Sequence, residues 1–404
     1  MASKPKILIT GITGYIGSNA ADYFARAGYD IYGISNDAAA GKGRIKKADV
    51  TDASQVRAAI RSIKPDIVLH TAAVSSLKQC EKDPKTAEKV NLFGTKNIVD
   101  ALLAIKPDSQ FVFLSTDYVF DGKKSGRSEK DAPHPATVYG KTKLAAEREA
   151  ARLKRSMAIR TSAVFGRGGS FFTYLSDSFK KGVAVDAYDD AYFTPTYIDF
   201  LLNSLHSLLT RKFIGTIHVA GSERISRYEF ALMLATAMGK PSFAVPSHKP
   251  ATEPLAHDSS LDASLLRKLT GMESPSIQKC INYALGSLLP PYFAHSDGRG
   301  SITGITQGRK WEEINFITSI KGSARGGHYH KETKEGIFIV EGRISVSMRE
   351  VQTGKQWSFL AEKGDFFIIP IGVSHTFEML EDSSWINMLT KAMAGKQKDM
   401  HKDR

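Results

Sequence analysis

A tyrosine and a lysine four residues apart offer the clearest chemistry in the first 300 residues. Tyr139 and Lys143 begin a stretch with helical spacing, so their side chains share one face of a helix. An ammonium group beside a phenol favours the phenolate and lowers the pKa of the tyrosine, which prepares it for proton transfer to a carbonyl oxygen. Thr116 closes a preceding apolar strand, and its hydroxyl could hold the same oxygen. These three residues are the predicted catalytic groups for a carbonyl substrate.

A glycine-rich turn lies near the N-terminus, between an apolar strand at Lys6–Thr10 and a helical stretch at 16–27. In such a turn the first glycine permits the bend, the second lets the backbone approach a pyrophosphate, and the third lets the helix pack closely on the sheet. The helix N-terminus offers free N–H groups to the phosphates. The predicted dinucleotide-binding residues include Gly11, Thr13, Gly14, Tyr15, Ile16, Gly17, Tyr139 and Lys143.

The end of the second predicted strand bears on which dinucleotide binds. An acidic residue there usually binds the ribose hydroxyls of NAD, but this sequence has the neutral Ser35 and Asn36, followed by cations that include Arg44. This pattern favours the 2′-phosphate of NADP, with NAD and a merely solvated basic loop as the alternatives. Two further pairs complete the predicted cofactor site, Asp49 and Val50 beside the adenine, and Ala72 and Ala73 beside the nicotinamide.

Three histidines and a glutamate in the last quarter of the chain have the spacing of a metal site. His328 and His330 are separated by one residue, so on a strand they face the same side, and Glu335 and His375 can converge on them from neighbouring strands. Imidazole and carboxylate ligands suit Zn, Mn, Fe or Ni. We predict that these four residues bind a divalent metal, with zinc as the first choice. Without a metal, His328 and His330 are candidate bases, and each histidine taken alone could be structural.

The segments that position these residues change type along the chain. Short apolar strands alternate with helical stretches, one of them at 87–105, which predicts an α/β fold: a Rossmann-like, doubly wound parallel sheet with helices on both faces. A breaker-rich stretch at 286–292 is followed by short β-rich runs, which predict an all-β barrel or jelly roll. The expected domains are 1–288 and 289–390, with a flexible basic tail over 391–404.

The composition of the 404-residue chain excludes several classes of protein. It is 42% hydrophobic and 24% charged, as in ordinary globular proteins. The two cysteines, Cys80 and Cys280, are too few for a disulfide framework or a cysteine-rich zinc module. No apolar run has the length of a membrane span, and we expect a soluble, cytoplasmic protein without membrane or nucleic-acid partners. The net charge of +13 instead suits a small phosphorylated ligand.

Residues 5–285 resemble the extended short-chain dehydrogenase/reductases, above all the dTDP-4-dehydrorhamnose reductase group. The likeness rests on the turn at 10–17, the stretch 115–122, the Tyr139–Lys143 pair and the later stretches 193–199 and 226–230. It implies that Thr116, Tyr139 and Lys143 form a catalytic triad, with Lys143 on the nicotinamide ribose. It also implies a sugar-binding site made of Asp117, Tyr118 and Val119. The same group includes non-catalytic regulatory proteins.

The spacings around the histidines match both motifs of the cupin family, apart from Met379, where the second motif commonly ends in asparagine. With the stretches 297–301, 325–331 and 370–375, this region resembles cupins that act on nucleotide-linked keto-sugars. It is most similar to the C-terminal domain of the bifunctional capsular-polysaccharide enzyme that makes UDP-2-acetamido-2,6-dideoxy-L-talose. In that enzyme too, a reductase precedes a zinc cupin.

These features together predict a bifunctional nucleotide-sugar enzyme of polysaccharide biosynthesis. The first domain would reduce a UDP- or dTDP-linked 4-keto-6-deoxy sugar with NAD(P)H. The cupin would epimerise or isomerise the keto-sugar, because a 4-keto group acidifies the protons at C3 and C5. Two alternatives stay open: a regulatory protein that binds NADP and a sugar nucleotide without turnover, and a reductase whose metal-binding cupin is structural. Family likeness also suggests a homodimer.

Overall fold

The computed structural model describes residues 4–37, 44–291, 293–297, 300–392 and 399–403. Part of the 297–301 motif therefore lies outside the described residues. The chain forms two compact units, which are described separately. The first comprises Met1–Tyr174, Asp186–Phe230 and Val245–Ile277, and the second comprises Leu175–Val185, Ala231–Ala244 and Gln278–Arg404.

The first unit is built on a sheet of seven parallel strands in the order β11-β6-β5-β4-β1-β2-β3. The strands are β1 (Lys6–Thr10), β2 (Asp30–Ser35), β3 (Ile45–Lys47), β4 (Ile67–His70), β5 (Gln110–Thr116), β6 (Ser156–Thr161) and β11 (Gly215–His218). The strand order reverses between β1 and β4. In open α/β sheets, ligands bind beside the carboxyl ends of the strands at such a point.

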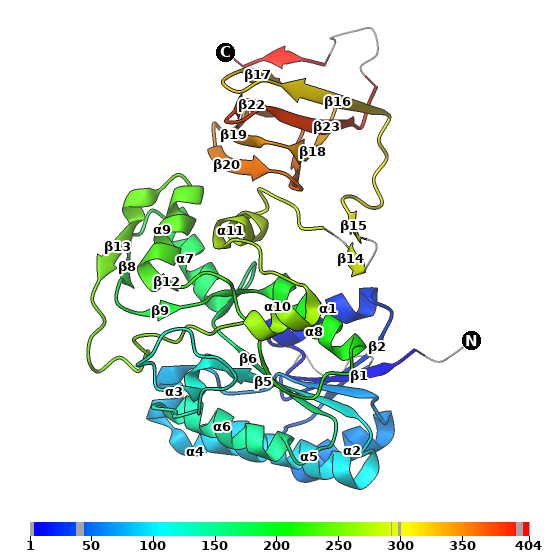
Figure 1. Cartoon of the computed structure of the whole chain (residues 1–404), viewed down its shortest axis with the longest axis vertical. Helices are drawn as coiled ribbons and strands as arrows, with labels where there is room; N and C mark the ends of the chain where they lie inside the picture. Colours follow the sequence, from blue (N-terminus) through cyan, green and yellow to red (C-terminus); the bar gives the residue numbers. More distant parts are fainter. Residues whose placement is uncertain (1–3, 38–43, 292, 298–299, 393–398, 404) are drawn as a thin grey trace. The chain divides into compact units, whose positions relative to one another are not determined.

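Helices cover both faces of this sheet, with α1 and α8 on one face and α2, α5 and α6 on the other (Figure 1). Their bounds are α1 (Tyr15–Arg26), α2 (Ala53–Ile63), α5 (Gly94–Ile105), α6 (Val138–Ala150) and α8 (Ile198–Thr210). Helix α2 shows how the sequence sets such an element. Asp52 accepts hydrogen bonds from the first free N–H groups, and Val56, Ala59, Ile60 and Ile63 form the buried stripe. The predicted Rossmann-like fold is confirmed.

The shorter elements of the first unit are α3 (Leu77–Lys82), α4 (Pro84–Glu88), β7 (Val164–Phe165), β9 (Tyr192–Phe193), β10 (Thr196–Tyr197), β12 (Ile225–Ser226) and α10 (Ser264–Thr270), with a 3₁₀ turn at Asp117–Val119. Four elements span a boundary in the chain between the two units: α7 (Ser170–Lys180), β8 (Val185–Tyr188), α9 (Arg227–Ala237) and β13 (Ala244–Ser247). The 3₁₀ turn at Pro241–Phe243 belongs to the second unit.

The single helix expected over 87–105 is instead interrupted. A π-helical turn at Lys89–Phe93 separates α4 from α5. The turn positions the side chain of the buried Asn91. The amide nitrogen of Asn91 donates to Thr142 Oγ1 at 3.1 Å and to the carbonyl of Val74 at 3.1 Å, and its amide oxygen accepts the N–H of Val74 at 2.8 Å. Hydrophobic periodicity alone could not indicate this, because the apolar residues keep helical spacing across the turn.

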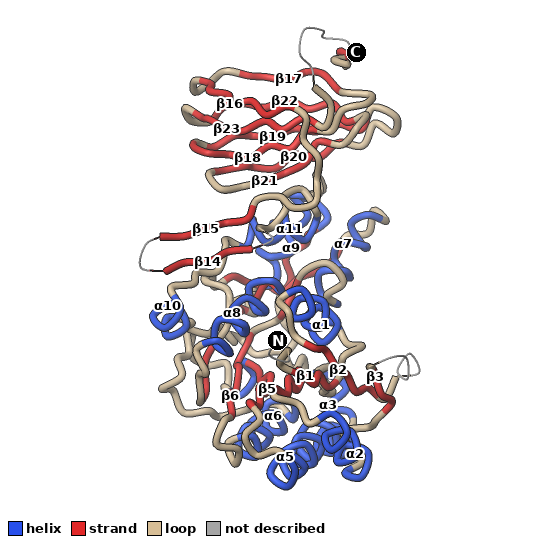
Figure 2. Tube along the Cα trace, turned by 90° about the vertical axis from the view of Figure 1, so that its right-hand side faces the viewer, coloured by secondary structure: helices blue, strands red, loops and turns tan. Residues whose placement is uncertain are grey.

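The second unit contains two antiparallel sheets, β16-β23-β18-β21 and β20-β19-β22-β17-β24 (Figure 2). Their strands are β16 (Glu313–Ser319), β17 (Ala324–Tyr329), β18 (Glu335–Glu341), β19 (Arg343–Glu350), β20 (Gln356–Glu362), β21 (Phe366–Ile369), β22 (Val373–Met379), β23 (Ser383–Leu389) and β24 (His401–Lys402), and a separate hairpin pairs β14 (Phe293–Asp297) with β15 (Gly300–Gly304). Their inward-facing side chains form one apolar core that includes Ile337, Val346, Phe367, Phe377 and Trp385. The predicted all-β region is confirmed.

Residues just before the strands belong to the same core. Leu288 is buried in it, and Leu289 N–H donates to the carbonyl of Phe366 at 2.8 Å. In helix α11 (Ile277–Leu285), Lys279 forms an ion pair with the buried Asp365 at 2.5 Å. The domain limits drawn from the sequence stay a prediction. Among the described residues, no helix has the length and apolar character needed to cross a bilayer.

Residues 399–403 make regular contacts with the second unit, whereas a flexible basic tail was expected over 391–404. Residues 393–398 lie outside the described part, but β24 pairs with β17, with Lys402 opposite His328 and His401 opposite Tyr329. Two guanidinium nitrogens of Arg349, Nε and Nη2, donate hydrogen bonds to the carboxylate of Asp403. A lysine-rich composition indicates exposure, but it carries no signal for pairing to a strand 70 residues earlier.

Candidate active site and histidine cluster

A cleft of about 420 Å³ opens at the carboxyl ends of β1, β4 and β5 in the first unit. It brings together the glycine-rich turn and the predicted catalytic groups. Its lining includes Gly11, Gly14, Tyr15, Ile16, Gly17, Ala73, Thr116, Asp117, Tyr118, Tyr139 and Lys143, all of them predicted site residues. This is the position at which the strand order reverses, as the fold requires of a ligand site.

The glycine-rich turn has the tight geometry expected from its sequence. Gly11 has a φ of +66°, and a Cβ there would lie 2.9 Å from the backbone of Ala72. A Cβ at Gly17 would lie 2.3 Å from the carbonyl oxygen of Gly11, so only glycine lets helix α1 start this close to the turn. Ala72 thus packs behind the turn, whereas Ala73 lines the cleft.

Tyr139 and Lys143 lie on the first two turns of α6, where Lys143 is buried against the end of β5 and Tyr139 is half-buried at the cleft. Lys143 Nζ donates to the carbonyl of Leu114 at 2.5 Å and lies 4.1 Å from the centre of the Phe113 ring. Burial lowers the pKa of Lys143 to about 7, although the negative charge of Glu147 acts to raise it. Burial also raises the pKa of Tyr139 above its usual range, although a hydrogen bond with Thr116 opposes the rise.

This corrects the expectation that the lysine lowers the pKa of the tyrosine. Desolvation of the phenolate outweighs every favourable contact, and the ammonium group is held on the strand carbonyl. At neutral pH Tyr139 is therefore a protonated phenol. Such a group is suited to donate a proton to an oxygen that becomes negatively charged.

The residues after Thr116 form a buried polar group at the floor of the cleft. Thr116 Oγ1 donates to Asp117 Oδ1 at 2.9 Å, and Ser162 Oγ donates to Asp117 Oδ2 at 2.8 Å. Burial raises the pKa of Asp117 despite these bonds. Val119 is fully buried in an apolar cluster and is not among the cleft-lining residues, so the structure does not bring it to the predicted sugar site.

A buried charge network behind the cleft was not predicted. Glu147 lies one helical turn beyond Lys143, and both its carboxylate oxygens accept hydrogen bonds from Arg160, at 3.0 and 2.8 Å. Ser115 Oγ donates to the same carboxylate at 2.5 Å. The network joins α6 to β5 and β6. The four-residue spacing from Lys143 was a signal that could have identified Glu147.

Only some of the residues expected to distinguish NADP from NAD lie near one another in the structure. Ser35 Oγ bonds Thr13 Oγ1 at 2.8 Å, beside the glycine-rich turn. Arg44 instead pairs with Asp30 at 2.9 Å, at the opposite end of β2 from Ser35. Lys47 is the cation that lies opposite Ser35 in the strand register. Neither Asn36, which is exposed, nor Asp49 and Val50 line the cleft.

Other cleft residues were missed as site residues. Arg227, the first residue of α9, lines the cleft with its guanidinium 3.8 Å from the centre of the Phe193 ring. It belongs to the 226–230 stretch, so the signal was present in the sequence. Ser162 and Phe171 also line the cleft. They follow β6 without a motif of their own.

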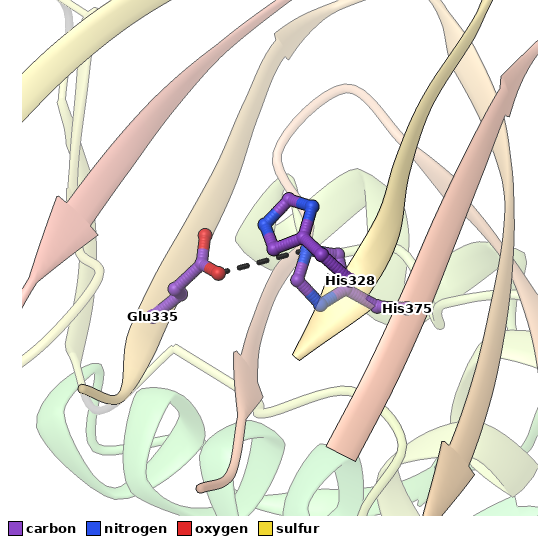
Figure 3. Close-up of side chains that lie close together, drawn as sticks. All are labelled: His328, Glu335 and His375. Carbon is purple, nitrogen blue, oxygen red and sulfur yellow. Dashed lines mark ion pairs between the residues drawn. The ribbon is translucent and has the colours of Figure 1, made fainter. Parts of the chain in front are cut away.

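In the second unit, His328, Glu335 and His375 come together from β17, β18 and β22, which belong to two different sheets (Figure 3). One ligand atom from each lies within 4.8 Å of the others. A bulge between Gly326 and His328 lets β17 approach β22, where a Cβ at Gly326 would lie 2.4 Å from the carbonyl oxygen of His375. Burial lowers the pKa of His375 to about 4, so its imidazole is neutral at pH 7.

His330 is at the edge of this cluster and has two close neighbours. Its Nε2 lies 2.7 Å from Glu335 Oε1, and its Nδ1 lies 2.7 Å from the carbonyl oxygen of Asp399. Although burial opposes its charge, these two acceptors raise the pKa of His330. Glu335 is fixed from the other side by Asn387, whose amide donates to Oε2 at 2.7 Å. The four predicted ligands therefore share one buried region.

Two family models together match most of the chain. Residues 5–289 match the RmlD substrate binding domain, and residues 295–398 match the polysaccharide biosynthesis C-terminal domain. The spore coat polysaccharide biosynthesis protein SpsK of Bacillus subtilis is 34% identical over 239 residues, which cover 58% of this chain and 80% of SpsK. Methionine adenosyltransferase 2 subunit beta of Xenopus laevis is 28% identical over 291 residues, which cover 67% of this chain and 84% of that protein.

A solved structure agrees with the family match. The dTDP-4-dehydrorhamnose reductase of Bacillus anthracis, determined in complex with NADP, superimposes with a TM-score of 0.63 at 26% identity, covering 70% of this chain and 99% of its own. The chain therefore belongs to the RmlD substrate binding domain family, the dTDP-4-dehydrorhamnose reductase-like members of the extended short-chain dehydrogenase/reductases, and carries a polysaccharide biosynthesis C-terminal domain after it.

Proposed function

We propose that the first unit reduces the C4 ketone of a UDP- or dTDP-linked 4-keto-6-deoxy sugar with NADPH. Its main support is that Thr116, Tyr139 and Lys143 line the same cleft as the glycine-rich turn. The family match and the NADP complex of the Bacillus anthracis reductase agree with it. The cytoplasmic location and the homodimer expected from the sequence stay predictions.

The cleft has what a dinucleotide requires. The backbone of Gly11 and Gly14 would be able to approach a pyrophosphate because no Cβ intervenes, and the N-terminus of α1 would offer it N–H groups. Lys47, opposite Ser35 in the strand register, would be available to a 2′-phosphate, which supports NADP over NAD. A bound nicotinamide would supply the hydride for the ketone carbon.

The remaining chemistry belongs to this chain. Thr116 and the phenol of Tyr139 would hold the ketone oxygen, and Tyr139 would transfer its proton to that oxygen as negative charge develops. The protonated phenol suits this role better than a phenolate would. Lys143 would bind the nicotinamide ribose, and Asp117 and Arg227 would orient the sugar nucleotide from the cleft wall.

For the second unit we propose a cupin-type metal site that serves the same keto-sugar by epimerisation or isomerisation. Neutral His330 has one N–H, and the Asp399 carbonyl can only accept it, so the Nε2 lone pair faces the Glu335 carboxylate at 2.7 Å. Two acceptors this close require a second proton or a shared cation. His328, His330, Glu335 and His375 therefore fit a divalent metal such as zinc, which would acidify a proton beside a ketone.

The alternative of a regulatory protein without turnover has one specific observation in its favour. The match to methionine adenosyltransferase 2 subunit beta covers 84% of that protein, which by its name is a subunit of a larger enzyme. A purely structural metal site in the second unit is the other alternative. An intact Thr116, Tyr139 and Lys143 in one cleft favours catalysis over the regulatory alternative for the first unit.

The Tyr139→Phe variant separates reduction from binding. We expect NADPH oxidation in the presence of a 4-keto-6-deoxy sugar nucleotide to fall about 10²- to 10⁴-fold, with the affinity for NADPH within about twofold of wild type. Stopped-flow absorbance at the NADPH band and fluorescence titration measure the two quantities. Wild-type protein that binds both ligands without oxidising NADPH would support the regulatory alternative.

A further inference from the structure

The histidine cluster receives an unexpected contact from the end of the chain. The carbonyl of Asp399 accepts a hydrogen bond from His330 Nδ1 at 2.7 Å. The carboxylate of the same residue accepts N–H groups from the turn that follows His330: Lys331 N at 2.8 Å, Thr333 N at 2.8 Å, and Glu332 N at 3.2 Å. Asp399 thus holds both the ring of His330 and the backbone that carries it.

The residues after Asp399 keep it in place. His401 packs against Tyr329 with 5.3 Å between ring centres and the rings tilted by 35°, and Asp403 pairs with Arg349. Strand β24 hydrogen-bonds to β17, the strand that carries His328. Arg349 lies on β19, so the segment 399–403 is tied to two strands of the five-stranded sheet.

This geometry fixes which nitrogen of His330 faces the cluster. The Asp399 carbonyl can only accept a hydrogen bond from Nδ1, so Nε2 is the nitrogen that lies 2.7 Å from Glu335 Oε1, where a proton or a metal ion can bridge the two. A hydrogen bond from the outer ring nitrogen to a carbonyl is the arrangement by which proteins orient histidines that bind metals. We propose that the C-terminal segment 399–403 is a positioning element of the metal site, acting through Asp399 on His330, and this inference rests on the metal site proposed above.

The role of Asp399 is testable by zinc titration of the full-length protein against a chromophoric chelator. Asp399→Ala removes the carboxylate that holds the 331–333 turn, and a chain that ends at Lys398 removes the whole segment. We expect zinc to bind about 10- to 100-fold more weakly to both, the range seen when such outer contacts of a metal ligand are lost. Asp382→Ala is the matched control: its carboxylate also accepts a backbone N–H in the second unit, from Lys321 at 2.8 Å, but it lies outside the segment, so the loss should change affinity less than twofold.

Three further measurements separate positioning from misfolding. All three tryptophans, Trp311, Trp357 and Trp385, lie in the second unit, so their fluorescence reports whether its core is intact in each variant. Hydrogen exchange of the metal-free protein should be faster at Lys331 and Thr333 in Asp399→Ala, and unchanged there in Asp382→Ala. The d–d spectrum of bound Co²⁺ should also change in Asp399→Ala only.

The outcomes distinguish this inference from the proposed function. If Asp399→Ala and the shortened chain bind zinc within twofold of wild type, the positioning role is wrong while the metal site stands. If wild-type protein binds neither zinc, cobalt nor manganese, the metal site and the positioning role are both wrong. Weaker binding in Asp399→Ala with an intact tryptophan signal supports the inference.

Discussion

The cleft of the first unit and the histidine cluster of the second are assembled in different ways. In the cleft, the reacting side chains come from the end of one strand and the start of the next helix, so Thr116, Tyr139 and Lys143 lie within 28 residues of one another. In the cluster, His328, Glu335 and His375 come from three strands in two sheets, and Asp399 joins them from the chain terminus. A site of the first kind depends on local spacing, and a site of the second kind depends on strand register.

The two sites also differ in how buried charge is balanced. Behind the cleft, Glu147 is matched by Arg160 and Ser115, so the protein itself completes the network. In the cluster, Glu335 Oε1 faces ring nitrogens that can be neutral. We therefore expect the first unit to depend on its own charge pairs and the second unit to depend on a bound cation.

The largest effect should come from the charge network behind the cleft. Glu147→Gln leaves the guanidinium of Arg160 buried without a matching charge, and we expect the free energy of unfolding to fall by about 3–5 kcal/mol. Urea unfolding followed by far-UV circular dichroism measures the change. Glu149→Gln is the control on the same helix, because its pair with Arg152 is partly exposed to solvent and should contribute less than about 1 kcal/mol. Equal losses in both variants would contradict the assignment.

Metal removal should affect the second unit by a smaller amount. Zinc at 100 times its dissociation constant should add about 2.7 kcal/mol to the stability of the folded form, and chelation should remove that gain. Thermal unfolding followed by tryptophan fluorescence reports this unit.

His375→Ala should abolish the zinc-dependent rise in melting temperature. His248→Ala should leave it unchanged, because the group formed by His248, Asp189 and Asp190 lies in the first unit, which contains no tryptophan. A melting temperature of wild type that does not respond to zinc would remove the contrast between the two units.

The smallest effect is a pH dependence that originates in the cleft. The folded pKa of Lys143 is about 7, well below its value of roughly 10.4 in an unfolded chain. Between these values the unfolded state binds more protons, so this group makes stability rise with pH, by at most about 1.4 kcal/mol per pH unit. Lys143→Met should flatten the stability profile between pH 7 and 9 relative to wild type, whereas the exposed Lys141→Met should not. Identical profiles for wild type and Lys143→Met would show that Lys143 keeps its proton in the fold.

The sequence indicated many of the residues that come together in the cleft, because their signals are local. The glycine spacing predicted a tight turn, and the structure shows why glycine is needed there: a Cβ at Gly17 would collide with Gly11. The Tyr139–Lys143 spacing gave one helix face. The prediction that Arg44 lies at the dinucleotide site was less successful, because the sequence does not indicate toward which end of the neighbouring strand a basic side chain extends. The pKa of Tyr139 was predicted in the wrong direction, because sequence spacing does not report burial.

The cluster was predicted only as a set of residues. Spacing indicated that His328 and His330 face one side, but the convergence of Glu335 and His375 depends on strand register and on the bulge at Gly326. The role of residues 399–403 could not be predicted, because their composition is that of a solvated tail and their partners lie at Tyr329 and Arg349.

The most direct test of the proposed reductase is the transfer of a labelled hydride. We would incubate the wild-type protein with NADPH that carries deuterium on the transferred position of the nicotinamide and with UDP- or dTDP-linked 4-keto-6-deoxy sugars, and follow the product by NMR. We predict one deuterium at C4 of the reduced sugar, and none with Tyr139→Phe on the same timescale. Both ligands bound at saturation by the wild-type protein, with no deuterium at C4 of any of these sugars, would contradict the proposed reaction.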